Sequence, residues 1–279
     1  MWLFRLILKG GWRVSSKETT SKTITVAFLL CIVCSIVVAG SVVLLKPIQE
    51  KNKALNLKTN ILAAAGLFVE GMSSSEIETA FSSIQPRIVD LETGNYVDSS
   101  IVGKANALDY DQRKASKNPK FSSVLSSDVD IASIKRRVRY SKVYLVEEKG
   151  NVKTIILPVS GYGLWSTLHG FLALESDANT VVGLGFYEHA ETPGLGGEVD
   201  NPRWKAIWPG KKVFDLEQGS MPQLKVLKGS VDKSRDSAIY EVDGLSGATL
   251  TSRGITNLVQ FWTGENGFQK YLDRLRKEV

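Results

Sequence analysis

Residues 137–158 read RVRYSKVYLVEEKGNVKTIILP, and this stretch decides the fold. Two runs rich in β-branched and aromatic residues, 137–147 and 152–158, flank a short polar turn at 149–151. A connection this short joins neighbouring strands as an antiparallel hairpin, because parallel strands need a crossover of about a dozen residues or more. The stretch therefore predicts the first hairpin of an antiparallel sheet.

Strand-like segments continue on both sides of this hairpin. Two further apolar runs, 168–175 and 181–188, are separated by a turn at 177–179 and predict a second hairpin. Another strand is expected at 224–229, and a short one at 87–90. The connections between these segments are short and rich in Gly, Asp, Asn and Ser, which favours antiparallel pairing throughout.

Helices are predicted at both ends of this strand region. Helical composition at 60–70 is followed by Ser73 and Glu76, whose spacing is that of a capping box at the start of a second helix. Near the C-terminus, apolar residues recur at helical spacing in two stripes that Gly264 separates. The first of these two C-terminal helices is expected to begin near residues 252–253.

One stretch is apolar enough to cross a membrane. Residues 23–45 carry no charge, lie between Lys22 and Lys46, and exceed the roughly 20 residues that cross a bilayer core. A cleaved signal peptide is the alternative, but its apolar region is usually only about 7–15 residues long. Lys and Arg residues are slightly more numerous before the span than just after it, which favours a cytoplasmic N-terminal segment at 1–22.

The fold class is therefore α+β: a mostly antiparallel sheet with flanking helices, plus one N-terminal transmembrane helix. Residues 91–136 are polar and lack a clear period, so loops and at most one strand are expected there. The apolar start at 2–9 is too short to span a bilayer, and an interfacial helix and an unstructured tail remain open for it. A modest net charge of +6, without a basic and aromatic stripe, argues against nucleic-acid binding.

Familiar catalytic and metal-binding patterns are missing from the sequence. His169 and His189 belong to no zinc-ligand set, and neither a P-loop nor a G-x-S-x-G nucleophile motif occurs. Cys31 and Cys34 have the spacing of a redox or metal motif, but they lie within the span, where small residues on one helix face suit packing. We therefore predict no catalytic residue and no metal site.

Three segments could instead hold a ligand. Residues 243–252, DGLSGATLTS, gather hydroxyl groups just before a predicted helix, and the free N–H groups and dipole of a helix start favour a phosphate. Ser and Thr are also ordinary N-caps, so the residues of this segment alone favour a simple cap over a ligand. The loops 160–166, SGYGLWS, and 188–197, EHAETPGLGG, offer the aromatic, apolar and polar groups that a flat ring requires. Both could also be plain turns between strands.

In combination, these segments resemble the FMN-binding domain family. The pattern D-x-x-S-G-A-T, complete at 243–249, is similar to that family's flavinylation motif, and the two loops resemble its flavin-pocket loops in the same order. From the span to about residue 263, the chain is most similar to the C subunits of sodium-translocating NADH:quinone oxidoreductases. The G subunits of Rnf complexes share the span, motif and flavin but tend to be shorter between span and sheet.

This resemblance implies a covalent FMN, esterified through its phosphate to Thr249 by a periplasmic flavin transferase. Asp243 would be recognised by the transferase and brace the turn, and Leu164 and Trp165 would flank the isoalloxazine. The other residues implied to line the flavin, its phosphate or its ribityl chain are Gly163, Glu191, Thr192, Gly194, Leu195, Ser246, Gly247, Ala248, Leu250 and Thr251.

The resemblance also implies a function. The chain would relay electrons inside a sodium-pumping NADH:ubiquinone oxidoreductase without being catalytically complete alone. Its partners would be the other membrane and flavoprotein subunits, the flavin transferase during maturation, and the lipid bilayer. It would be a single-pass protein of the bacterial inner membrane, with an FMN-binding domain at 46–279 in the periplasm. The G subunit of an Rnf-type complex, and a membrane-tethered binding or adaptor domain in which Thr249 only caps a helix, are the alternatives.

Overall fold

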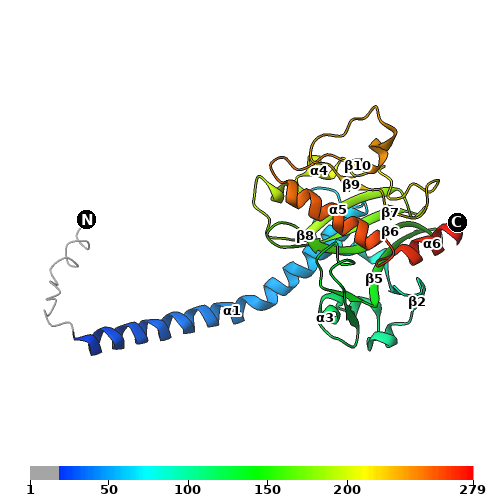
Figure 1. The fold of residues 1–279 in the computed structure, drawn as a ribbon. Coiled ribbons are helices and arrows are strands. Elements are labelled where there is room, and N and C mark those ends of the chain that lie inside the picture. Colours follow the sequence, from blue (N-terminus) through cyan, green and yellow to red (C-terminus); the bar gives the residue numbers. More distant parts are fainter. Residues whose placement is uncertain (1–18, 279) are drawn as a thin grey trace. The chain divides into compact units, whose positions relative to one another are not determined.

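The computed structural model describes residues 19–278, and the chain divides between Lys53 and Ala54 into two compact units. The second unit is built around a six-stranded sheet with the order β2-β1-β5-β6-β7-β8 (Figure 1). Every neighbouring pair in this sheet is antiparallel, which confirms the α+β class. The long strands are β1 (Ile84–Asp90), β5 (Tyr140–Glu148), β6 (Asn151–Tyr162), β7 (Thr167–Glu175) and β8 (Val181–Glu188), and the helices of this unit with more than two turns are α2 (Ser74–Ser82), α5 (Thr249–Thr263) and α6 (Gln269–Glu278).

Both faces of the sheet are covered, which explains why its strands read as nearly continuous apolar runs. Along β5, Val143 and Leu145 belong to a buried cluster with residues of α5 and α6. Their neighbours Tyr144 and Val146 point the other way and pack with α2 and Ile61. An antiparallel sheet with one solvated face would alternate apolar and polar residues instead. The sheet is therefore a middle layer, and α5 lies on it along β6 (Figure 1).

Two hairpin turns lie where the sequence predicts them. Lys149 and Gly150, between β5 and β6, have φ values of 54° and 83°, as the two central residues of a type I′ turn require. Between β7 and β8, Asp177 Oδ1 accepts hydrogen bonds from the Asn179 and Thr180 amides. Strand β6 runs beyond the predicted end at residue 158, because its pairing with β7 continues to Tyr162.

Two predicted strands differ in the structure. The run 137–147 is divided into β4 (Arg136–Val138) and β5, because the Arg139 amide donates to Phe121 O while β4 pairs with β3 (Ser122–Val124). The run 224–229 contains only the two-residue β9 (Lys225–Val226), which pairs in parallel with β10 (Glu241–Val242) outside the main sheet. The Val226 amide donates to Thr256 Oγ1 of α5 at 2.9 Å, so this segment lies against the helix.

The region 91–136 is more ordered than its polar sequence predicts. It contains β2 (Tyr96–Val97), the 3-10 turns η3 (Ser99–Val102) and η4 (Ala107–Asp109), the short helix α3 (Gln112–Ser116) and β3. After the main sheet come η5 (Gly196–Asp200), α4 (Pro202–Lys205) and η6 (Asp236–Tyr240). Within 91–136, the side chains of Asp98, Asn106 and Asp111 cap η3, η4 and α3. Such short capped turns have no apolar period, so periodicity does not predict them.

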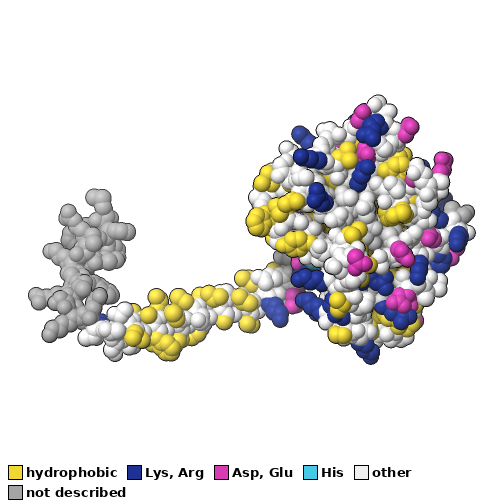
Figure 2. All heavy atoms as spheres, viewed as in Figure 1, with side chains coloured by type: hydrophobic (Ala, Val, Ile, Leu, Met, Phe, Trp, Pro, Cys, Tyr) yellow, Lys and Arg dark blue, Asp and Glu magenta, His cyan; other side chains and the backbone are white. Residues whose placement is uncertain are grey.

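Helix α1 (Thr20–Ala64) contains the predicted span 23–45 and continues through Pro47. The polar stretch 46–58 is therefore helical, and the helix predicted at 60–70 ends at Ala64, since Gly66 adopts a left-handed φ of 71°. Among the described residues, α1 is the helix long and apolar enough to cross a membrane. Figure 2 shows hydrophobic side chains along the visible face of this helix. The stretch 2–9 lies outside the described residues.

Candidate functional site

The three segments singled out in the sequence are tied together by one carboxylate. Glu191, which follows β8, accepts hydrogen bonds at Oε1 from the amides of the β6–β7 connection: Leu164 at 3.1 Å, Trp165 at 3.0 Å and Ser166 at 3.2 Å. Its Oε2 accepts the hydroxyl of Thr251, in the first turn of α5, at 2.7 Å. Residues far apart in the chain thus meet at the N-terminal end of α5.

The Glu191 carboxylate is buried and charged. Burial disfavours its ionised form, but the hydrogen bonds from Thr251 and from the amides of the β6–β7 connection outweigh this effect and hold the pKa of Glu191 below its ordinary value. The Glu191 amide donates to Nδ1 of His189 at 3.2 Å, so Nε2 carries the ring proton that reaches Asp200 at 2.8 Å. His189 therefore supports the loop through both ring nitrogens.

Helix α5 begins earlier than the sequence predicts, and its start lacks a side-chain cap. The helix starts at Thr249, which makes Ala248 the N-cap residue. Ala248 has no side-chain oxygen, and no side-chain hydrogen bond is made at this position. The hydroxyls that could have capped it are engaged elsewhere: Thr251 donates to Glu191, and Ser252 Oγ accepts the Leu245 amide at 3.0 Å. Within the described part of the chain, no side chain accepts a hydrogen bond from the first-turn amides, which leaves them available to an anion.

Two glycines permit the close approach of these segments. A Cβ on Gly163 would lie 2.7 Å from Glu191 Oε1. A Cβ on Gly196 would lie 2.6 Å from Thr251 Oγ1 and 2.7 Å from Glu191 Oε2. Any larger residue at either position would displace the carboxylate or its hydroxyl partner.

Apolar side chains remain exposed around the start of α5. Trp165 is 66% exposed, Leu250 51% and Leu195 44%, although such residues usually pack inside. Thr249 is exposed as well, at the first position of α5. Of the other residues predicted for the site, Leu164, Thr192, Gly194, Ser246 and Gly247 are exposed, Ala248, Thr251 and Glu191 are buried, and Gly163 and Asp243 are partly buried. An exposed hydroxyl, uncapped amides and an apolar border fit a phosphate attached to a flat ring.

Asp243 is engaged within the protein. Its Oδ1 accepts the Val231 amide at 2.7 Å, and its carbonyl oxygen accepts Nε1 of Trp204 at 2.9 Å. These contacts hold the chain that leads into α5. Asp243 therefore braces the segment before α5 through both its backbone and its side chain.

Sequence reasoning missed two residues that build the site. Ser166 donates its amide to Glu191, and its Oγ accepts the Ala190 amide at 2.7 Å, which joins the two loops a second time. Gly196 is required by the contact between Glu191 and Thr251. The only signals in the sequence were the polar end of SGYGLWS and the repeated glycines of PGLGG.

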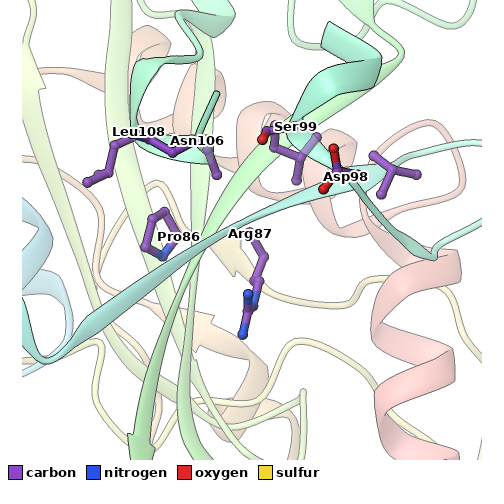
Figure 3. A pocket seen from close by; sticks show the side chains of 9 residues that line it. Pro86, Arg87, Asp98, Ser99, Asn106 and Leu108 are labelled. Carbon is purple, nitrogen blue, oxygen red and sulfur yellow. The ribbon is translucent and has the colours of Figure 1, made fainter. Parts of the chain in front are cut away.

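A separate hollow of about 450 Å³ lies beside β1 and contains none of these residues (Figure 3). Pro86 and Arg87 of β1 face Ser99, Asn106 and the neighbouring turns across it. The Asn106 side chain is already used, since its Oδ1 accepts the Asp109 amide at 3.1 Å. In the part of the chain that the structure describes, no group of three or more His, Cys, Asp or Glu residues could hold a metal ion.

Comparison with known proteins agrees with this geometry. Residues 163–264, which contain the β6–β7 connection, the Glu191 loop and the start of α5, match the FMN-binding domain family. The chain is 52% identical over 265 residues to the C subunit of the Na(+)-translocating NADH-quinone reductase of Pseudomonas aeruginosa, and the match covers 95% of this chain and 99% of that protein. The chain belongs to the family of these C subunits. Another C subunit, from Vibrio vulnificus, is 43% identical, and its match covers 94% of this chain and 98% of its own.

Solved structures of C subunits have the same fold. The crystal structure of Shewanella oneidensis NqrC matches with a TM-score of 0.72 and 36% identity, over 81% of this chain and 99% of that one. The C subunit from Parabacteroides distasonis matches with a TM-score of 0.60 and 27% identity, over 82% of this chain and 96% of that one. The resemblance inferred from the three motifs is therefore confirmed at the level of the family.

Proposed function

We propose that this chain carries FMN as a phosphate ester on Thr249 and relays electrons as a membrane-anchored subunit of a sodium-translocating NADH:quinone oxidoreductase. Its family and its FMN-binding domain support, at a coarser level, a flavoprotein subunit of this complex. The observation that carries the finer proposal is the start of α5. An exposed Thr249 lies there beside backbone amides that no side chain among residues 19–278 caps.

Different residues of this site would hold the phosphate and the ring of the cofactor. Thr249 Oγ would carry the phosphate, and the first-turn amides of α5 would stabilise its negative charge. Leu164 and Trp165 on one loop, and Leu195 on the other, would cover the faces of the ring. The residues that would line the flavin between them are Thr192, Gly194, Ser246, Gly247, Ala248 and Leu250. FMN itself supplies the electron chemistry when it is bound. The protein needs no general acid or base for that step.

We further propose that α1 anchors the chain as a single span in the bacterial inner membrane. Its uncharged segment 23–45 suits the hydrocarbon core, and Lys22 and Lys46 would lie at the two interfaces. The domain at 46–279 would then be periplasmic and within reach of a flavin transferase, with residues 1–22 in the cytoplasm. The lipid bilayer and the other subunits of the complex would be its partners.

The test compares protein made with and without a flavin transferase. Denaturing gel electrophoresis followed by in-gel fluorescence detects only flavin that is covalently attached. We expect a fluorescent band for wild type with the transferase, and a dark band for Thr249→Ala. Ser230→Ala, which removes an exposed hydroxyl outside the motif, should stay fluorescent. A dark wild-type band would favour the adaptor alternative, and a fluorescent Thr249→Ala band would move the ester to Ser246 or Thr251.

A further inference from the structure

The Glu191 carboxylate has both oxygens occupied by groups of this chain. Oε1 accepts three consecutive amides, from Leu164 to Ser166, and Oε2 accepts the Thr251 hydroxyl together with a longer contact of 3.3 Å from the Leu164 amide. The family resemblance implies that Glu191 offers hydrogen bonds to the flavin. The observed contacts instead use its acceptors to join one loop to one helix end.

We propose that Glu191 is a positioning residue: with Thr251 it clasps the 163–166 loop to the first turn of α5, and so fixes where the flavin ring rests relative to Thr249. The proposal rests on the function proposed above and concerns the same site. Glu191 and Thr251 orient the ring, whereas Thr249 carries the covalent bond.

The apolar side chains of the loop do little to fix its conformation. Its two large side chains, Leu164 and Trp165, are 38% and 66% exposed and so contribute few buried contacts. Besides the clasp, it is held by hydrogen bonds from the Gly163 amide to Ser166 O at 2.9 Å, from the Ala190 amide to Ser166 Oγ at 2.7 Å and from Tyr162 Oη to Trp165 O at 3.4 Å. None of these hydrogen bonds reaches α5. The Gly163 backbone packs closely against the next turn of α5, since a Cβ on Gly254 would lie 3.0 Å from Gly163 Cα. Among the described residues, the clasp adds the hydrogen bonds that tie the loop to the first turn, which contains Thr249.

A tethered ring needs such a link. An ester on Thr249 would fix the phosphate, but the ribityl chain between phosphate and ring has several rotatable bonds. The orientation of the ring therefore depends on the surface it rests on, and a site is precise only when its supporting residues are themselves fixed. Thr251 lies two positions after Thr249 in the same helical turn, so the clasp ties that surface to the point of attachment.

Charge and space both suit a clasp. A carboxylate accepts hydrogen bonds more strongly than a neutral amide, and here it gathers three amides and a hydroxyl in a buried position. Gly196 supplies the space, because a Cβ there would strike both Thr251 Oγ1 and Glu191 Oε2. The glycine and the carboxylate are separate observations that point to the same contact.

The experiment uses the full-length protein, purified in detergent after co-expression with a flavin transferase. Glu191→Gln removes the charge, and Thr251→Val removes the hydroxyl at nearly constant volume. Two matched controls remove the same groups elsewhere. Thr263→Val alters another buried threonine of α5, whose hydroxyl donates to Val259 O at 2.7 Å, and Asp90→Asn alters a buried carboxylate that pairs with Arg139.

Two readouts on the bound flavin separate positioning from attachment. Flavin fluorescence reports the distance to Trp165, because stacked tryptophan quenches it, and visible circular dichroism reports a fixed asymmetric environment. We expect Glu191→Gln and Thr251→Val to keep wild-type covalent flavin, while fluorescence rises severalfold and the visible dichroism weakens. Both controls should match wild type in fluorescence and dichroism.

Three results would overturn the proposal. One is wild-type fluorescence and dichroism in Glu191→Gln and in folded Thr251→Val. Another is an equal change in the two controls, which would make the effect one of general stability. The third is loss of covalent flavin in a folded Glu191→Gln domain, which would place Glu191 in the attachment. If wild type itself carried no flavin on Thr249, the proposed function would fail instead, so the two failures are distinguishable.

Discussion

Two helices in the same unit, α2 and α5, begin in opposite ways. At α2, Ser73 Oγ accepts the Glu76 amide at 3.3 Å, and Glu76 Oε2 accepts the Ser73 amide at 2.7 Å, which completes the predicted capping box. At α5, Ala248 stands at the N-cap and offers no side-chain acceptor. The carboxylate near α5 comes from Glu191, 60 residues before Thr251, and from this helix it accepts the Thr251 hydroxyl. Its amide donors are Leu164, Trp165 and Ser166 of the β6–β7 connection.

The two helices differ in whether nearby side chains bind the backbone amides of the first turn. At α2, the capping box satisfies the Ser73 and Glu76 amides with local side chains. At α5, the hydroxyls of Thr251 and Ser252 are directed to Glu191 and to the Leu245 amide, and the first-turn amides stay uncapped. An uncapped helix end is less stable by roughly 1 kcal/mol. A bound phosphate would restore that stability, which links cofactor attachment to the fold.

The largest expected effect separates attachment from capping. Thr249→Ala should abolish covalent flavin completely, because it removes the oxygen that would carry the ester. The flavin-free protein should lose less than about 0.5 kcal/mol of unfolding free energy, since Thr249 is exposed and does not cap the helix. Intact-mass analysis and urea unfolding of flavin-free proteins measure the two effects. A loss near 1 kcal/mol would mean that Thr249 acts as a cap after all.

Gly196→Ala tests how tightly the start of α5 is built. The new methyl group would lie within 2.7 Å of Glu191 Oε2 and Thr251 Oγ1, so we expect a loss of about 1–3 kcal/mol in unfolding free energy. Gly185→Ala is the matched control, because a Cβ there meets nothing within 4 Å. Urea unfolding of both variants provides the measurement. Equal stability of the two would show that the Gly196 contact relaxes freely.

Ser73→Ala tests the other helix start. Loss of the cap should cost about 1 kcal/mol and lower Tm by about 2–4 °C, while covalent flavin stays at the wild-type level. Scanning calorimetry and in-gel fluorescence on one preparation give both values. Reduced flavin in this variant would mean that the two helix starts are not independent.

The smallest expected effect is a pH dependence at the two carboxylates. Hydrogen bonds hold the pKa of Glu76 below 4.5, and those to Glu191 outweigh its burial with the same result. A carboxyl whose pKa is lowered by folding stabilises the protein above its unfolded pKa, and this stabilisation disappears as pH falls through the folded pKa. The Tm difference between wild type and Glu191→Gln should therefore be full at pH 7 and shrink below pH 4.5.

Glu76→Gln should follow the same profile with a smaller amplitude, because Glu76 is exposed. Thermal unfolding of both variants over a pH series provides the comparison. A difference that grew as the pH fell would contradict the account of these carboxylates.

Local chemistry explains which parts of the fold could be predicted. The hairpin at Lys149 and Gly150 and the capping box at Ser73 are encoded by neighbouring residues, and both are present. The strand predicted at 224–229 was wrong in extent because its partners, β10 and Thr256, are distant in the sequence. The start of α5 was placed too late because Ser252 looks like an N-cap residue in the sequence. In the structure Ser252 lies within the helix, and its hydroxyl accepts the amide of Leu245, which precedes the helix.

The candidate site follows the same rule. The resemblance of three motifs marked its segments, and the structure brings Leu164, Trp165, Glu191 and Thr251 together. The role of Glu191 could not be read from the sequence, because it depends on which groups surround one carboxylate after folding. Gly196 is explained only by that same contact.

Peptide mass spectrometry after co-expression with a flavin transferase tests the central claim most directly. Trypsin should release residues 236–253 as one peptide, since Arg235 and Arg253 flank a stretch without other Lys or Arg. The account predicts an added FMN-phosphoryl mass on this peptide, with fragment ions that assign it to Thr249. An unmodified peptide, or a flavin located on Ser246 or Thr251, would contradict it.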